Sequence, residues 1–140
     1  MRTVRHDGRE YLLVKQSEAS SLVRDPATGS ERYLPNEELD PVDGTSPLTT
    51  AAGAVPEPVR RVLVAAPDER ALGLLLEIDR RGPLPPRVLL ESYDLCESDT
   101  LGLVSEFRAA GLVEEREDSG VRGYDTTDAG SEGLERLRDG

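Results

Sequence analysis

Two arginines flank a short turn near the C-terminus, in the stretch EREDSGVRG. Arg116 precedes the turn residues 117–120 and Arg122 follows them. A guanidinium is permanently charged and can donate to two phosphate oxygens at once, so this pair could reach a nucleic-acid backbone or a narrow minor groove. Acids at positions 114, 115, 117 and 118 offer another interpretation, in which the arginines form ion pairs on a solvated hairpin. The sequence leaves both interpretations open.

A second set of polar side chains lies in YDLCESDTLGLVSEFRAAG, residues 93–111. The apolar spacing predicts a turn and then a helix that ends at Gly111. The residues predicted to face inward are Leu103, Val104, Phe107 and Ala110. Those predicted to face outward are Glu97, Ser98, Asp99, Leu101, Gly102 and Glu106. Glu97 and Asp99 suit the positive end of a helix dipole, but carboxylates in that place repel phosphate.

The elements that position these side chains follow from helical periods and caps. Residues 56–66 carry an apolar stripe at helical spacing, made by Val59, Val62, Leu63 and Ala66. A further helix starts at Pro67-Asp68-Glu69 and ends before Gly82-Pro83. Its predicted buried face comprises Leu72, Leu75, Leu76 and Ile78. A short helix in PPRVLLESY follows, and after the charged hairpin Thr126 or Thr127 can cap a last helix.

In this order, residues 68–139 resemble the winged helix-turn-helix family of bacterial and archaeal regulators, including its MarR-like and ArsR-like groups. The resemblance rests on LLESYDL, FRAAGLVEE and, after the charged hairpin, RGYDTTDAG. It implies an α+β fold over residues 56–140, with a three-helix core, a β wing and flanking helices. It also implies that the helix ending at Gly111 enters the major groove while the wing reaches the backbone or minor groove.

Carried onto this sequence, the resemblance implies a set of residues that contact DNA. Hydroxyls can donate to phosphate oxygens, arginines can neutralise them, and exposed Leu101 beside small Gly102 permits apolar contact at close range. The candidates are Arg87, Ser98, Asp99, Thr100, Leu101, Gly102, Arg108, Arg116 and Arg122.

The N-terminal residues 1–35 predict a small antiparallel β module. Turns at Asp7-Gly8 and at residues 25–29 separate short runs of strand-forming residues, which gives three or four strands. The stretch LVRDPATGSERYLP is similar to small modules that precede winged-helix domains in haloarchaeal proteins. Residues 36–55 are rich in Pro, Gly, Thr and acids, which predicts a linker.

The charge balance bears on any binding to DNA. The chain has 28 Asp and Glu against 17 Lys and Arg, a net charge of −11, and Lys15 is its single lysine. This composition resembles that of proteins from extremely halophilic archaea, which high charge keeps soluble in concentrated salt. At molar salt the Debye length is about 3 Å, so the negative field does not exclude DNA at a distance.

Other chemistry finds little support in the residue types. Cys96 and His6 are the only members of their types, which excludes a disulfide or a Cys/His zinc cluster within one chain. No nucleophile, base or phosphate-binding loop is spaced for catalysis, so we expect no enzyme, no catalytic residue, no metal and no cofactor. We interpret Cys96 as a packed thiol or weak helix cap, with a redox sensor as the alternative. The polar N-terminus and the lack of a long apolar run predict a cytoplasmic protein without a membrane segment.

Together these features predict a transcriptional regulator adapted to high salt that binds double-stranded DNA as a homodimer. Dimerisation is implied by the family's habit and by the spare apolar helices at residues 57–66 and 126–138. The alternative is a winged-helix module that binds a protein partner through the same acidic surface around Leu101. Acids on the outward face of residues 97–108 favour that alternative, whereas the family resemblance favours DNA.

Overall fold

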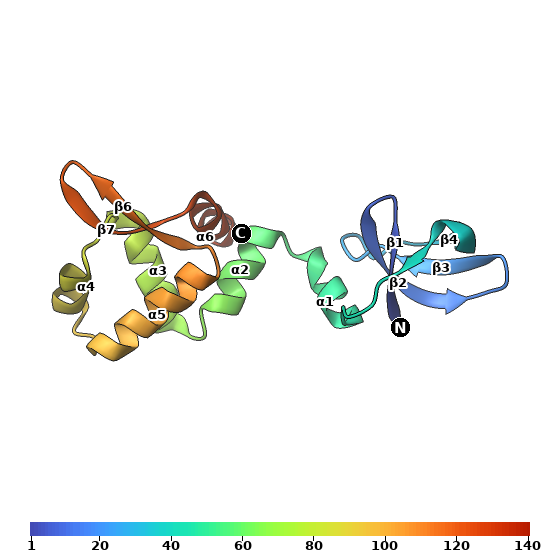
Figure 1. Cartoon of the computed structure of the whole chain (residues 1–140), viewed down its shortest axis with the longest axis horizontal. Coiled ribbons are helices and arrows are strands. Elements are labelled where there is room, and N and C mark those ends of the chain that lie inside the picture. The colour runs from blue at the N-terminus through green and yellow to red at the C-terminus, as the bar shows by residue number, and fades with distance from the viewer. The chain divides into compact units, whose positions relative to one another are not determined.

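Residues Met1–Pro56 form the first of two compact units in the computed structural model, which describes all 140 residues (Figure 1). Its five-stranded antiparallel sheet has the order β4-β3-β2-β1-β5. The strands are β1 Arg2–His6, β2 Arg9–Gln16, β3 Ser20–Arg24, β4 Glu31–Pro35 and β5 Asp40–Pro41. As predicted, Asp7 and Gly8 make the first turn, both at positive φ, which a two-residue hairpin of this kind requires. The buried core consists of Val4, Tyr11, Leu13, Val23 and Leu34.

The segment 36–55, predicted to be a linker, contributes ordered elements to this unit. They are the 3-10 helix η1 Asn36–Glu38, strand β5, helix α1 Pro47–Ala51 and the 3-10 helix η2 Ala52–Ala54. Strand β5 pairs with β1, and buried Thr50 of α1 places its hydroxyl 2.7 Å from that of Thr3. These elements are two to five residues long, too short to produce a periodic pattern, so their composition alone predicted a linker.

The second unit, Glu57–Gly140, contains five α-helices and a two-stranded hairpin. The helices are α2 Glu57–Ala65, α3 Glu69–Arg81, α4 Pro86–Tyr93, α5 Glu97–Ala109 and α6 Asp128–Asp139. The hairpin strands are β6 Val113–Asp118 and β7 Val121–Thr126. Phe107 is the largest fully buried side chain, and it lies in one core with residues of α2, α3, α4 and α6.

Side-chain caps start two of these helices where the sequence predicts them. The Asp68 carboxylate accepts a hydrogen bond from the Ala71 amide at the start of α3. Of the two candidate caps for α6, Thr127 accepts from the Gly130 amide, whereas Thr126 donates to Asp79. Satisfying the free amides in this way fixes where each helix begins.

The hairpin is held to the helices by a backbone bridge that the sequence does not reveal. Leu84, between α3 and α4, exchanges two hydrogen bonds of 2.8 Å with Tyr124 of β7. A Cβ atom on Gly123 would lie 2.2 Å from the Leu84 carbonyl carbon, so only glycine permits this approach. The bridge therefore ties the hairpin to the segment between α3 and α4.

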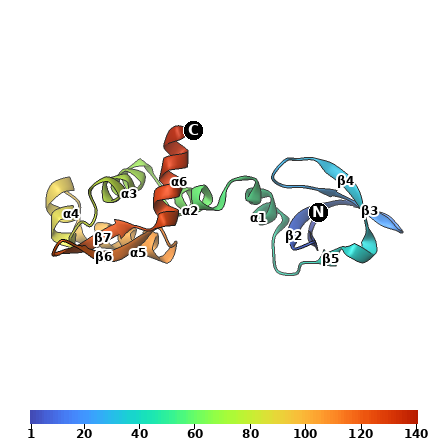
Figure 2. The same ribbon diagram turned by 90° about the horizontal axis from the view of Figure 1, so that it is seen from above.

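The outer helices α2 and α6 pack side by side (Figure 2). The predicted buried face of α3 needs one correction, because Leu74 is buried while Leu72 and Leu76 are only partly covered. Both partly covered leucines line a groove bordered by α2 and α6. Across the whole chain, no helix combines the length and apolar character that crossing a membrane requires.

Candidate nucleic-acid interface

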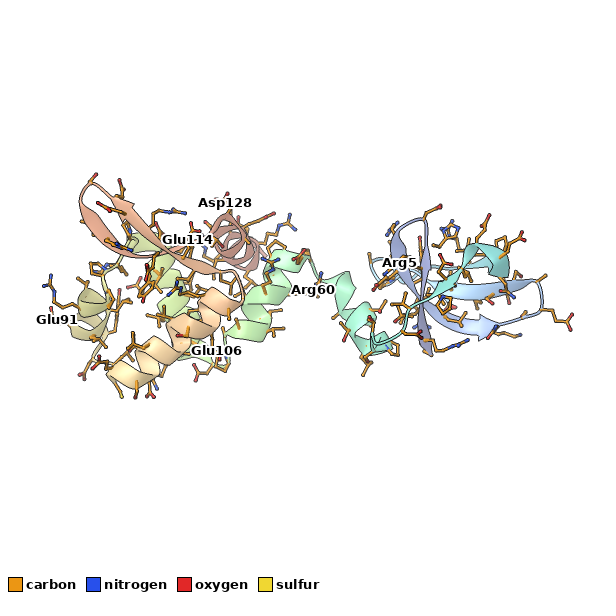
Figure 3. All side chains as sticks on the ribbon, viewed as in Figure 1. Arg5, Arg60, Glu91, Glu106, Glu114 and Asp128 are labelled. Atoms are coloured by element: carbon orange, nitrogen blue, oxygen red, sulfur yellow. The ribbon has the colours of Figure 1, made fainter.

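The exposed surface of α5 has two sides with different chemistry. Residues seven apart lie on the same side of a helix, so Leu101 and Arg108 share one side and Asp99 and Glu106 share the other. Arg108 lies over the Tyr124 ring, at 5.9 Å from its centroid, so its side faces the hairpin. Figure 3 labels Glu106 on the side of α5 turned away from the hairpin. The outward surface, predicted as one acidic face, is therefore divided.

Two arginines converge on one carboxylate on the hairpin side. Arg108 Nη1 lies 3.8 Å from Glu115 Oε1, and Arg122 Nη2 lies 3.4 Å from Glu115 Oε2. The register of the hairpin explains this, because Glu115 pairs with Tyr124 and the next cross-strand pair on the same face includes Arg122. The side chain of Arg122 remains 75% exposed. Glu115 is the one carboxylate within ion-pair distance of both guanidiniums, and Glu117, the cross-strand partner of Arg122, supplies a second negative charge on the same face.

Arg116 lies on the opposite face of the hairpin. It donates to Glu114, Asp125 and the carbonyl of Thr126. The bond to Glu114 raises the pKa of Arg116 above its usual value, with a further contribution from the charge of Asp125. The structure therefore supports the ion-pair interpretation for Arg116. Its side chain lies apart from Arg108 and Arg122.

The far side of α5 borders an open depression of about 450 Å³. Its lining residues are Asp68, Arg70, Ser98, Asp99, Gly102, Leu103 and Glu106. Asp99 and Glu106 form no ion pair, and three carboxylates face a single guanidinium here. This side of α5 repels phosphate.

The other predicted contacts fall in different places. Thr100 is 1% exposed and donates to the carbonyl of Cys96, so its hydroxyl cannot reach a ligand, and its prediction as a DNA contact is wrong. The period of α5 brings Thr100 to the side of Val104 and Phe107. Ser98 and Gly102 are exposed, and Leu101 is 40% exposed. Arg87 is exposed in the first turn of α4 without an ion-pair partner.

Cys96 departs from the packed thiol of the sequence interpretation. It occupies the N-cap position of α5, and its side chain is exposed. Its sulfur lies 3.1 Å from Ser98 Oγ. Hydrogen bonds from the Ser98 hydroxyl and from the amides of Asp99 and Ser98 lower the pKa of this thiol. No group of three or more His, Cys, Asp or Glu side chains is arranged to hold a metal ion.

Sequence reasoning named Glu115 only as one of four acids near the arginines and did not assign Tyr124 to the site, so it missed that both lie together beside Arg108 and Arg122 in the hairpin-side cluster. The strand register identifies both, because an antiparallel hairpin with its turn at residues 119–120 pairs Glu115 with Tyr124. A register drawn from the turn EDSG could have found this pair. The approach of Arg108 from α5, by contrast, depends on the packing of the helix against the hairpin.

Comparison with known proteins gives one match. A family model described as "Family of unknown function (DUF7346)" matches residues 1–138. No curated protein and no solved structure matches the chain. The matched region includes both compact units.

Proposed function

The chain belongs to this family of unknown function over nearly its whole length, and we propose that its second unit is a winged helix-turn-helix module that binds double-stranded DNA. The order of elements supports the fold: three helices, α3 to α5, are followed by a hairpin and a closing helix. The turn between α4 and α5 includes Asp94 in the left-handed conformation, and Leu84 pairs with β7 of the hairpin through an isolated β-bridge. In such modules the helix after the turn enters the major groove.

The observation that carries the proposal is the convergence of Arg108 and Arg122 on Glu115. A phosphate group can take the place of the shared carboxylate and accept from both guanidiniums, because their geometry suits two oxygens. Leu101 lies on the same side of α5 as Arg108 and offers apolar contact to a base edge. The acids Asp99 and Glu106 lie on the other side, so the approach from the hairpin side avoids them.

We propose that the module acts as a cytoplasmic transcriptional regulator in a halophilic archaeon. The acid excess and the near absence of lysine support a high-salt setting. In that setting the net charge of −11 is screened within a few ångströms, at a Debye length of about 3 Å. Close hydrogen bonds and shape complementarity then contribute more to binding than long-range attraction.

The acidic depression on the far side of α5 favours a second candidate function, the binding of a protein partner. Asp68, Asp99 and Glu106 offer three carboxylates to a basic segment of such a partner. The two proposals use different sides of α5, so variants can separate them.

The test is selection of genomic DNA fragments by the purified full chain in multimolar KCl. The informative variant is Arg108→Gln with Arg122→Gln, and the matched control is Arg116→Gln on the opposite face of the same hairpin. We expect one shared site to be enriched by the wild type and by the control, and lost by the double variant. Two charge-assisted contacts of about 1.5 kcal/mol or more each correspond to a loss of affinity of at least about a hundredfold.

Two results would contradict the proposal. One is no enrichment above background by wild-type protein whose circular dichroism shows that it is folded. The other is equal binding by the wild type and the double variant. The protein-binding function would be supported instead if the wild type enriched no DNA site but bound a basic protein, and if the Asp99→Asn, Glu106→Gln variant lost that binding.

A further inference from the structure

A pocket in the first unit borders the buried core of its sheet. Its volume is about 340 Å³, at the lower end of the range of about 300–1,000 Å³ that is typical of small-molecule sites. The strand register explains its polar and apolar sides, because Arg2 lies opposite Leu13 and Gln16 lies opposite Ser21 on neighbouring strands. The apolar wall of the pocket consists of Val4, Leu13, Leu39, Pro41, Val42 and Pro47.

The uncharged polar groups beside this wall are bonded within the protein. The Ser21 hydroxyl donates to Oδ1 of Asn36, and Nδ2 of Asn36 donates to the carbonyls of Ser17 and Glu18. These bonds tie the 3-10 helix η1 to the turn between β2 and β3, so the shape of the pocket is formed before any ligand binds. Recognition of a ligand therefore depends on the charged residues of the pocket.

Arg2 borders the pocket and has no carboxylate partner in the chain. Its Nη2 donates over 3.0 Å to Oε1 of Gln16, which is a neutral amide and leaves the charge of the guanidinium uncompensated. The other arginines of this unit are engaged elsewhere: Arg5 with Glu10, Arg9 with Asp25, Arg24 with Glu31, and Arg32 over the ring of Tyr11. A guanidinium has five donors, so Arg2 can still bind both oxygens of a carboxylate.

Asp43, in the loop between β5 and α1, borders the same pocket. Its carboxylate has neither an ion-pair nor a hydrogen-bond partner in the chain, and in particular it does not pair with Arg2. Two opposite charges thus border one pocket without neutralising each other. A ligand with a single charge would satisfy one of them and leave the other unpaired.

We propose that this pocket binds a free α-amino acid with an apolar side chain. The carboxylate of the ligand accepts from Arg2, its ammonium donates to Asp43, and its side chain lies against the apolar wall. An α-amino acid carries both charges on one carbon atom, so a molecule small enough for the pocket satisfies both residues at once. The apolar wall strengthens the two charged contacts, because it keeps water away from one side of them.

The test is isothermal titration calorimetry of the full-length protein with L-leucine, L-isoleucine, L-methionine and L-phenylalanine. The KCl concentration is the lowest at which the fold persists, because salt screens charged contacts. For an amino acid that binds, three comparison ligands each remove one contact: the N-acetyl derivative lacks the ammonium, the amide lacks the carboxylate, and glycine lacks the apolar side chain. We expect each of them to bind at least about tenfold more weakly.

Two variants assign the contacts to residues. We expect Arg2→Gln and Asp43→Asn each to weaken binding about tenfold. Arg2→Gln should also bind the amino acid and its amide equally, because the group that distinguishes them is gone, and Asp43→Asn should do the same for the N-acetyl derivative. The matched controls are Lys15→Gln and Asp40→Asn, which remove exposed charges of the same sign outside the pocket and should leave binding unchanged.

Three results would overturn the proposal. They are no binding of any of the four amino acids at millimolar concentration by protein that circular dichroism shows to be folded, equal binding of an amino acid and its N-acetyl or amide derivative by the wild type, and equal losses in the pocket variants and their controls. The titration contains no DNA and probes the first unit, so its failure would leave the proposed DNA binding of the second unit untouched.

Discussion

Replacing Gly133 by alanine tests whether the close packing of α2 on α6 holds the second unit together. A Cβ atom at this position would lie 2.4 Å from the carbonyl oxygen of Pro58 and 2.9 Å from Cγ2 of Val62. Contacts between carbon atoms are normally about 3.5–4.0 Å, so the two helices would have to separate by roughly 1 Å. The matched comparison is Gly73→Ala inside α3, where an added Cβ meets no atom within 4 Å.

The two substitutions share one effect and differ in the other. Alanine at either position favours the helix by about 0.8–1.0 kcal/mol relative to glycine. At Gly133 the forced separation costs about 1–3 kcal/mol, as overpacking of a core does. We therefore expect Gly73→Ala to stabilise the unit by about 1 kcal/mol. We expect the free energy of unfolding of the Gly133→Ala variant to be about 1–3 kcal/mol lower than that of the Gly73→Ala variant.

Thermal unfolding followed by circular dichroism at helical wavelengths measures this difference, because α2 to α6 all lie in the second unit. For a domain of this size, 1 kcal/mol corresponds to about 4–8 °C in Tm. Gly133→Ala should therefore melt at least about 4 °C below Gly73→Ala in the same KCl concentration. Equal melting temperatures, or a higher one for Gly133→Ala, would refute the packing argument.

Three further outcomes are expected. Phe107→Ala should destabilise the second unit by about 3–5 kcal/mol, measured by denaturant unfolding, because Phe107 is fully buried. In the first unit, Thr50→Val should cost about 1–3 kcal/mol by leaving the buried Thr3 hydroxyl unpaired, and the double change Thr3→Val, Thr50→Val should recover part of this loss in thermal unfolding. Cys96 should react with iodoacetamide faster than a free thiol below pH 8, because a lowered pKa raises the thiolate fraction. Ser98→Ala should slow this reaction, because it removes the hydrogen bond that contributes most to the lowered pKa. An unchanged rate in that variant would contradict the assignment.

The sequence by itself determined the order and type of most elements. The stripe through Val62, the Gly82-Pro83 stop and the Thr126-Thr127 pair of candidate caps are local signals, because helical period, missing amides and capping hydroxyls act within a few residues. The Asp7-Gly8 turn was equally local, since positive φ is a property of those two residues. The α+β class followed from these pieces, as did the separation of β-rich and helical parts.

Tertiary structure alone decided which charged side chains act together. Arg116 and Arg122 are equivalent in the sequence, yet the hairpin register places them on opposite faces, one tied to Asp125 and the other beside Arg108. Thr100 has a polar hydroxyl that favours water, yet it is buried because it lies on the side of α5 that packs into the core. Short elements such as β5 and α1 contain too few residues for a periodic apolar pattern. They form because they pack on the sheet, where β5 pairs with β1 and Thr50 of α1 contacts Thr3. Contacts between residues far apart in the chain depend on packing, which no local pattern contains.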